Sequence, residues 1–385
     1  MIKVPYFTRF AVVLSTMGAS ALAASAILTA CSGGQILPPP LPDGGGGAGG
    51  SGVTTGDMAT TDSSSASGTG GGATGTGGAM PAMLTWVTKL DPSKFELPEG
   101  LAMNAAGDTA YVSIAPTGQI LQIKVSDGTV SPFGSVPQPP AMKGFALGVQ
   151  TDKAGDFYVA VASFDPATYQ PGIYKIPAAG GAATLFAKDA AMNFPNGMTF
   201  NAAGDLFVTD SIAGSIYKIT SAGVVTKWLT DPLISGDTMA KCPSGQPFPI
   251  GANGIVISGT DFYVTNTDKA SMAKIAIKGD GTAGAVTDFV KTDCMAFGGP
   301  DGLSVDADGT FLVASNGINS ITRVGTDGKV TLLAAKTVAA PLDAPASTWI
   351  TNAGKAGATL FVTNSGISTF LSGGMAKPGL FKLAL

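Results

Sequence analysis

The fold of this chain is decided by one recurring stretch, whose clearest copy reads Pro195-Asn196-Gly197-Met198-Thr199-Phe200-Asn201-Ala202-Ala203-Gly204-Asp205-Leu206-Phe207-Val208-Thr209-Asp210. Apolar residues alternate on both sides of a Gly-Asp pair, so the stretch predicts a strand, a tight reversal and a second strand. Similar copies begin at Pro98, Gly148, Asn253 and Pro300, and a weaker copy runs through Trp349.

The copies share one position, occupied by residues 99, 147, 196, 253, 301 and about 347, which gives a repeat of about 50 residues. A repeat of this length built from short strands is typical of β-propellers. Six copies therefore predict an all-β, six-bladed propeller over residues 83–385. The last copy ends without an outer strand, so we predict that residues 83–90 supply that strand and close the ring.

The segment before the propeller has the sequence features of an exported lipoprotein. Lys3 and Arg9 precede an apolar stretch that ends in Leu28-Thr29-Ala30-Cys31. We interpret residues 1–30 as a lipoprotein signal peptide and Cys31 as the lipidated residue; the alternative is an ordinary secretory signal with an incidental Cys. Residues 31–82 are rich in Gly, Ser, Thr and Pro, which predicts a disordered tether. The expected location is the cell envelope, on the periplasmic or surface side of the outer membrane.

Composition excludes several classes of function. The formal net charge is −4, Arg occurs only at positions 9 and 323, and no basic cluster is present, so nucleic acid is not an expected partner. The chain has no His, which removes Ser-His-Asp triads and His metal sites. We expect a monomer that binds a small molecule and contacts a membrane through its lipid.

Two further cysteines, Cys242 and Cys294, lie in segments expected to be loops. In an exported protein they are expected to form a disulfide between neighbouring loops, with two free thiols as the alternative.

The shared repeat position carries Glu99, Asn196, Asn253 and Asp301, each followed by Gly. Equivalent positions of a cyclic fold point to one centre, and two carboxylates with two amides are oxygen ligands for a hard cation. We therefore predict a site for Ca²⁺ first, with Mg²⁺, Mn²⁺ and Zn²⁺ as alternatives. Asn-Gly and Asp-Gly pairs also form ordinary turns. However, Leu147-Gly148 in the second copy shows that the repeat does not demand a polar residue there.

Polar residues also follow the second strands of several copies. The prediction is that four of them bind substrate at the same mouth: Asp210, Asn266, Asn316 and Asn364. The alternative is that they cap strand ends and turns.

The Pro-Glu-Gly, Pro-Asn-Gly, Asn-Gly and Pro-Asp-Gly copies beginning at residues 98, 195, 253 and 300 resemble those of the gluconolactonase/regucalcin family of calcium-dependent six-bladed propellers, with paraoxonases and strictosidine synthase as distant relatives. The resemblance covers residues 83–385. It implies that Glu99, Asn196, Asn253 and Asp301 hold the metal and that Asp301 acts as base or nucleophile. Two features depart from the family: the His pair of paraoxonases is absent, and no residue matches the substrate-contacting Arg of sugar lactonases. The repeat also resembles NHL propellers, which mostly bind partners.

The sequence thus supports two classes of function. The first is a lipid-anchored, metal-dependent hydrolase of lactone-like or ester substrates. The second is a non-catalytic, NHL-like propeller that binds a cell-surface partner or glycan, with or without a structural calcium.

Overall fold

The computed structural model describes residues 83–141, 143–240, 242 and 248–385. The predicted signal peptide and tether, and with them Cys31, lie outside the described residues. In the described part, no helix is long and apolar enough to span a membrane.

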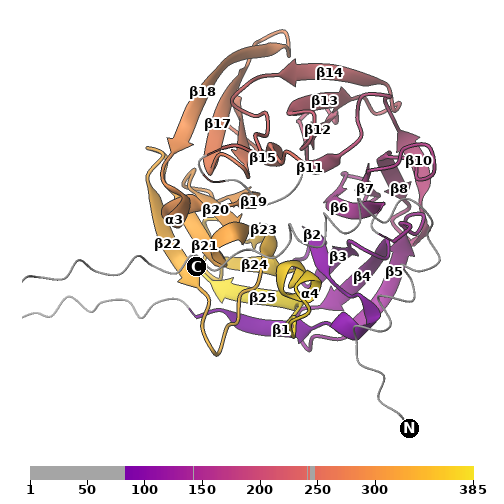
Figure 1. The fold of residues 1–385 in the computed structure, drawn as a ribbon, viewed down its shortest axis with the longest axis vertical. Helices are drawn as coiled ribbons and strands as arrows, with labels where there is room; N and C mark the ends of the chain where they lie inside the picture. Colours follow the sequence, from indigo (N-terminus) through magenta and orange to yellow (C-terminus); the bar gives the residue numbers. More distant parts are fainter. Residues whose placement is uncertain (1–82, 142, 241, 243–247) are drawn as a thin grey trace, which may run out of the picture. The chain divides into compact units, whose positions relative to one another are not determined.

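Six sheets, each built on four antiparallel strands, surround a central axis, which confirms the predicted all-β, six-bladed propeller (Figure 1). Each sheet is one blade. In blades one to five the chain enters at the strand nearest the axis and moves outward strand by strand. The strand order of the sixth sheet, β1-β25-β24-β23, shows that its outermost strand comes from the start of the domain.

From the axis outward, blade one contains β2 (Pro98–Met103), β3 (Thr109–Ile114), β4 (Gln119–Lys124) and β5 (Val130–Ser135), with the short β9 (Gly181–Ala182) pairing parallel to β5. In the same order, blade two contains β6 (Gly144–Thr151), β7 (Phe157–Ser163), β8 (Gly172–Ile176) and β10 (Thr184–Ala187). Blade three contains β11 (Pro195–Phe200), β12 (Leu206–Asp210), β13 (Ser215–Ile219) and β14 (Val225–Thr230).

Blade four contains β15 (Ala252–Ser258), β16 (Asp261–Asn266), β17 (Ser271–Ile277) and β18 (Ala283–Lys291). Blade five contains β19 (Pro300–Val305), β20 (Phe311–Ser315), β21 (Ser320–Val324) and β22 (Val330–Ala335). Blade six contains β23 (Pro345–Thr351), β24 (Thr359–Asn364), β25 (Gly379–Ala384) and β1 (Thr85–Lys89). The short helices are η1 (Pro92–Lys94), α3 (Cys294–Phe297), η2 (Asn316–Ile318) and α4 (Ile367–Leu371).

Ring closure occurs as predicted. Strand β1 pairs antiparallel with β25, and Figure 1 shows the two lying side by side on the outer side of the sixth blade. The rings of Trp86 and Phe381 stack with their centroids 3.8 Å apart. The first and last strands of the domain therefore share one sheet, which leaves no open gap between blades six and one.

Aromatic clusters bind neighbouring blades to each other. Tyr263 of blade four, for example, lies 4.5 Å from Phe311 of blade five and 4.9 Å from Phe289, measured between ring centroids. Phe207 and Phe262 make the corresponding contact between blades three and four. Such pairs bury large apolar surfaces, so the core of this domain lies mainly between the blades.

The Gly-Asp hairpins lie at the end of the blades opposite the starts of the inner strands. Gly204 has φ +89°, a left-handed conformation that favours glycine. Beside it, Asp205 pairs with Lys218 at 2.8 Å, and Asp156 pairs with Lys175 at 2.8 Å in blade two. These ion pairs and the glycine conformation give the hairpins a structural role.

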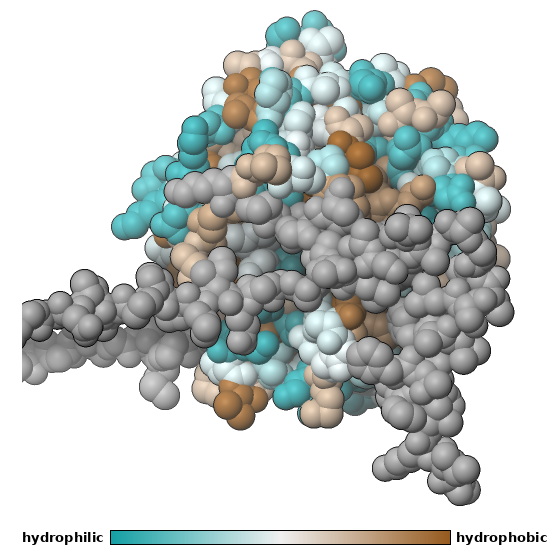
Figure 2. Space-filling model, viewed as in Figure 1, coloured by the Kyte–Doolittle hydropathy of each residue, from teal (hydrophilic) through white to brown (hydrophobic). Residues whose placement is uncertain are grey.

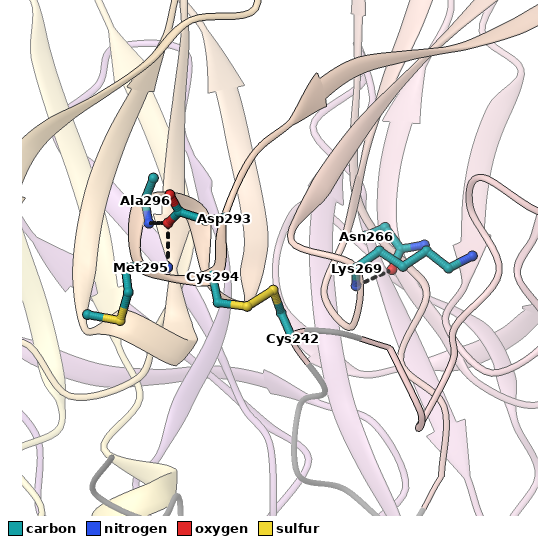
Figure 3. Close-up of a disulfide and its surroundings, with 7 residues drawn as sticks. All are labelled: Cys242, Asn266, Lys269, Asp293, Cys294, Met295 and Ala296. Atoms are coloured by element: carbon teal, nitrogen blue, oxygen red, sulfur yellow. Dashed lines mark hydrogen bonds between the residues drawn. A yellow bond between two sulfur atoms is a disulfide. The ribbon is translucent and has the colours of Figure 1, made fainter. Parts of the chain in front are cut away.

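One disulfide joins the connecting segments on either side of blade four. Cys242 follows β14, Cys294 begins α3, and their Cα atoms are 5.4 Å apart, so the predicted pairing is confirmed. Figure 3 shows Asp293 beside this bond, where its carboxylate accepts hydrogen bonds from the backbone N–H groups of Met295 and Ala296, both at 2.9 Å. The cap fixes the start of α3 and with it the position of Cys294.

The disulfide is expected to contribute strongly to stability. Replacing both Cys242 and Cys294 with serine frees a loop that spans 52 residues of sequence. By the chain-entropy relation, this lowers the free energy of unfolding by about 4 kcal/mol. Urea unfolding of the double variant measures the loss, and Cys31→Ser is the control because Cys31 is not in this bond. Equal midpoints for the double variant and the unmodified protein would contradict the assignment.

Candidate metal centre

The four predicted metal ligands begin the inner strands of blades one, three, four and five. Asn196, Asn253 and Asp301 are buried, with 5–8% of their surface exposed, and Glu99 is partly buried. In each strand the pairing with the second strand is interrupted at this point, for example between Pro195 and Met198. The Asn-Gly and Asp-Gly pairs nevertheless lie within the strands β11, β15 and β19. They do not form turns, so the turn does not explain their residues.

The glycine after each ring position is explained by close packing between blades. A Cβ atom on Gly197 would lie within 3.0 Å of the carbonyl oxygen of Asn253, and one on Gly254 would lie 2.6 Å from that of Asp301. Gly100 and Gly148 face the next blade in the same way. A side chain at these positions would push the inner strands apart, so glycine keeps the ring narrow.

In blade six, Ala346 occupies the position equivalent to Asn196 in blade three. Pro345 pairs with Asn364 as Pro195 pairs with Asp210, and the ring residue follows the proline in both blades. The expected position, about 347, was one residue too far along the chain. Ser347 takes the place of the glycine.

Hydroxyl groups on the second strands fix the backbone of the ring. The Thr209 hydroxyl donates to the carbonyl oxygen of Asn253 at 2.6 Å, and the Thr265 hydroxyl donates to that of Asp301 at 2.7 Å. The Thr363 hydroxyl donates to the carbonyl oxygen of Glu99 at 2.8 Å. The last of these bonds joins blade six to blade one. Each hydroxyl therefore holds the ring residue of the following blade.

A second set of hydrogen bonds orients the two amides. Asn196 donates its Nδ2 to the Ser211 hydroxyl at 3.1 Å, and that hydroxyl donates to the carbonyl of Ala252 at 2.8 Å. Asn253 donates its Nδ2 to Thr267 at 3.0 Å, and Thr267 donates onward to a carbonyl at 2.9 Å. Because the amide nitrogens are engaged with the protein, the amide oxygens are the polar atoms left for a ligand.

The two carboxyl groups share a buried environment. Burial raises the pKa of Glu99 well above its usual value, and the negative charge of Asp301 adds to the shift. Burial also raises the pKa of Asp301 to about 7, although hydrogen bonding by Asn316 and Asn253 opposes this shift. Removing water from two neighbouring carboxylates is costly, and a cation between them would offset that cost.

These residues fit a hard divalent cation. Two carboxylates balance its charge, and two oriented amide oxygens add neutral ligands, as Ca²⁺ prefers. Among the described residues there is no group of three or more His, Cys, Asp or Glu side chains that could hold a metal. The candidate centre therefore depends on the combination of two acids with two amides.

Of the four predicted substrate-binding residues, the structure brings one to the ring. Asn316 donates its Nδ2 to Oδ2 of Asp301 at 3.4 Å. The other three bond to loop backbone: Asp210 accepts from Phe194 N–H, Asn266 donates to two carbonyls, and Asn364 accepts from Asp343 N–H. All three are fully buried. These hydrogen bonds are those expected of the capping alternative, and substrate binding by Asp210, Asn266 and Asn364 stays a prediction.

Sequence reasoning missed the hydroxyls that support the amides. Pro195 pairs with Asp210 and Ala252 pairs with Asn266, so these two residues are equivalent. Ser211 and Thr267 come one position later, and Asn316 stands at the same place in blade five, one residue after Ser315. Ser211 and Thr267 lie in turns and Asn316 begins η2, so the chain leaves the second strand at this point and the later residue reaches the ring. The signal was present as the pairs Asp-Ser and Asn-Thr.

Thr267 offers a direct test of this support. Thr267→Val removes the hydroxyl that receives the Asn253 amide, and we expect the affinity for Ca²⁺ to fall about tenfold, the lower end for such supporting bonds. Titration calorimetry of the purified protein with Ca²⁺ measures it. Thr348→Val is the matched control, because Thr348 also donates to a carbonyl, that of Leu312 at 2.9 Å, without contacting a ring ligand. Equal affinities in both variants would show that the hydroxyl does not support the centre.

Two cavities lie in the described part of the propeller. One of about 270 Å³ lies inside the channel, directly beside the ring, because its lining starts at the glycines that follow the ring positions, among them Gly197, Gly254 and Gly302. The other, of about 310 Å³, lies between blades two and three at the hairpin end, near Asp152 and Gly204. Neither is lined by the four candidate ligands.

Comparison with known proteins supports the family resemblance. Residues 240–366 match the family model described as the SMP-30/Gluconolactonase/LRE-like region, and this stretch includes Asn253 and Asp301. No curated protein sequence matches the chain.

Several solved structures share the fold. A gluconolactonase of Xanthomonas campestris is 18% identical over 79% of this chain and 89% of its own, with a TM-score of 0.56. Regucalcin of Agrobacterium tumefaciens, a calcium-binding protein, is 19% identical over 78% and 94%, with a TM-score of 0.53. An auxiliary nutrient binding protein of Bacteroides thetaiotaomicron is 11% identical over 78% and 76%, with a TM-score of 0.56. At such identities the likeness establishes the fold, and activity must be argued from the site.

Proposed function

We propose that this protein is a divalent-cation-dependent hydrolase of lactone or ester substrates. The observation that carries the proposal is the pair of oriented amides, Asn196 and Asn253, together with the carboxyl groups of partly buried Glu99 and buried Asp301 at one mouth of the channel. A purely structural ring would not need two carboxylates in a place where their charges repel. The match of residues 240–366 to the gluconolactonase model supports a lactonase-type reaction.

Glu99, Asn196, Asn253 and Asp301 would hold the cation, with Ca²⁺ the first expectation. When bound, the ion would polarise the substrate carbonyl and stabilise negative charge on its oxygen. Asp301 would act as general base and remove a proton from the attacking water. As the water oxygen bonds to the carbonyl carbon, the bond from that carbon to the ring or ester oxygen breaks, and the proton passes to the departing oxygen. Asn316, which donates a hydrogen bond to Oδ2 of Asp301, would hold the Asp301 carboxylate in position to act as the base.

Cation dependence tests the proposal. The purified protein, stripped of metal with a chelator, should hydrolyse a panel of lactones and aryl esters at least a hundredfold more slowly than after Ca²⁺ is restored. A pH-indicator assay follows the acid released. Mg²⁺, Mn²⁺ and Zn²⁺ are added in parallel to rank the ions. Activity that survives complete removal of metal would rule out the proposed mechanism.

A binding role is the second candidate. It is favoured by the lack, among the described residues, of an Arg at the ring that could contact a substrate as in sugar lactonases. Arg323, the only Arg in the propeller, lies on β21 and donates a hydrogen bond to Thr310 at the hairpin end, away from the ring. A propeller with calcium in a structural role would melt at a higher temperature with Ca²⁺ and show no turnover on the same panel. The nutrient binding protein of Bacteroides thetaiotaomicron shows that this fold also occurs in proteins named for binding.

We also propose that Cys31 carries a lipid and tethers the propeller to the cell envelope. The proposal is supported by the Leu28-Thr29-Ala30-Cys31 pattern and the Gly-rich segment that follows it. Labelling of the expressed protein with a palmitate analogue, compared with Cys31→Ser, tests it, and equal labelling of the two proteins would rule out lipidation at this site.

A further inference from the structure

Blade two differs from its neighbours at both positions that face the mouth. Its ring residue is Leu147, and Ala162 takes the place that Ser211 and Thr267 occupy in blades three and four. Leu147 and Ala162 pack with Phe194 in a small buried cluster that is separate from the clusters between the blades. Blade two thus presents hydrocarbon where blades three and four present polar groups.

Four phenylalanines extend this apolar surface, and we refer to Phe145, Phe164, Phe194 and Phe248 as the aromatic wall. Phe164 is central, with its ring centroid 4.8 Å from that of Phe248, 5.2 Å from Phe194 and 6.0 Å from Phe145. Phe194 is buried, whereas the other three remain partly exposed. Aromatic side chains that are left partly open beside a site can receive an apolar ligand group.

The chain places the aromatic wall across the ring from Asp301. Leu147 belongs to blade two and Asp301 to blade five, and in a closed ring of six blades the second and fifth lie opposite each other (Figure 1). Phe194 is also only two residues before Asn196, a candidate cation ligand. A substrate with its carbonyl at the cation would therefore have an acid on one side and hydrocarbon on the other.

One ion pair lies beside the aromatic wall. Lys143 Nζ lies 2.8 Å from Asp165 Oδ2, and Phe164 N–H donates to the carbonyl of Lys143. The same ion pair lowers the pKa of Asp165. A sugar acid would need hydrogen-bond donors and acceptors for its hydroxyl groups, and the phenylalanine rings supply none.

Another partly open aromatic contact among the described residues is the smaller pair of Phe95 and Phe370, whose ring centroids are 5.6 Å apart. Exposed large apolar residues such as Met239, Met295, Val338 and Met375 belong to four different connecting segments. On the uncovered part of the face in Figure 2, hydrophobic residues occur in small groups among hydrophilic ones, as on ordinary protein surfaces.

We propose that the aromatic wall selects the substrate: the site accepts lactones or esters whose acyl part carries a bulky apolar substituent, which packs on Phe164. This inference rests on the proposed function, because it places the reacting carbonyl at the candidate metal centre. It also explains why a residue corresponding to the Arg of sugar lactonases is not needed.

The test uses the purified full chain with Ca²⁺ and two pairs of ligands. For turnover, γ-phenyl-γ-butyrolactone is compared with γ-butyrolactone, and glucono-δ-lactone is added. For binding without turnover, 3-phenylcyclopentanone is compared with cyclopentanone by ligand-observed NMR. We expect the phenyl compounds to be preferred at least tenfold in kcat/KM and in affinity. Phe164→Ala should lower kcat/KM for the phenyl lactone about tenfold more than for γ-butyrolactone, and Phe164→Leu should restore part of this difference.

Phe200→Ala is the matched control, because Phe200 packs on Tyr158 with centroids 5.2 Å apart at the other end of blade three. It should change no preference. A preference for glucono-δ-lactone, or an equal effect of Phe164→Ala on both lactones, would overturn the proposal while leaving hydrolysis established. If 3-phenylcyclopentanone binds through Phe164 and no lactone or ester is hydrolysed, the aromatic wall stands and the proposed function fails. Equal affinity of Phe164→Ala and the unmodified protein for the phenyl ketone would also overturn it.

Discussion

Replacing Asp301 with asparagine is expected to abolish hydrolysis and, at the same time, to stabilise the metal-free protein at neutral pH. Hydrolysis is lost because the variant removes both a cation ligand and the proposed base, and loss of a general base alone typically costs a factor of 10² to 10⁴. The gain in stability has a separate cause. Burial raises the pKa of Asp301 to about 7, so ionisation of this group opposes folding when no cation is bound.

The sign of the pH dependence follows from this shift. Below pH 3.8, the ordinary pKa of an aspartate side chain, the carboxyl group is protonated in both folded and unfolded chains, so it costs nothing there. As the pH rises from about 4 to about 7, the unfolded chain ionises first and the folded state loses relative stability. At about 1.4 kcal/mol for each pKa unit, the cost above pH 7 reaches about 4 kcal/mol. Asp301→Asn should recover it, so the two metal-free proteins should differ most near pH 8 and little near pH 4.

Thermal melting of both proteins with chelator and with Ca²⁺ measures these effects. The unmodified protein should melt at a much higher temperature with Ca²⁺ at pH 8, and this response should be nearly absent in the variant. Asp205→Asn is the matched control: it makes the same chemical change at a partly exposed ion pair with Lys218, where little effect is expected. If the metal-free Asp301→Asn variant melts at a lower temperature than the unmodified protein at pH 8, ionisation of Asp301 does not destabilise the metal-free fold.

The sequence predicted the parts of this structure that the repeat itself encodes. The six blades were predicted because equivalent residues of a repeat occupy equivalent places, and the closing strand at residues 83–90 was predicted because the last copy lacks an outer strand. The pairing of Cys242 with Cys294 was predicted from their positions in loops of an exported protein. The blade positions of the four candidate ligands also followed from the repeat. Their roles as ligands stay a prediction until a cation is measured.

Contacts between blades could not be read from one copy of the repeat. In the sequence, nothing accounted for Gly197 beyond the alternative of an ordinary turn, whereas the structure shows that the carbonyl of Asn253 in the next blade lies against it. The choice between Asp210 and Ser211 was missed for a similar reason. A polar pair at a strand end does not reveal which member faces the ring, and the first was selected although the second supports Asn196. The point at which the chain leaves the strand decides this, because Asp210 ends β12 and Ser211 lies in the turn that follows.

Removing strand β1 should destabilise the entire propeller, although it takes away only residues 85–89. The pairing of β1 with β25 runs from Thr85 opposite Lys382 to Lys89 opposite Gly379. Its loss removes several interstrand hydrogen bonds, each worth about 1 kcal/mol, and the stacking of Trp86 on Phe381. We expect the free energy of unfolding to fall by roughly 5 kcal/mol or more, because blades six and one then meet without a shared strand.

Deletion of residues 60–64 is the control, since it shortens the chain equally within the Gly/Ser-rich segment. Trp86→Ala should produce part of the loss, and comparison with the β1 deletion separates the contribution of the ring stack from that of the strand pairing. The deletion also exposes β25 as a free edge, so concentration-dependent association should appear in light scattering. The candidate metal centre should weaken as well, because Thr363 of blade six holds the carbonyl of Glu99 across the same junction. A β1 deletion variant with unchanged melting and unchanged Ca²⁺ affinity would show that the ring is held closed by the inner strands alone.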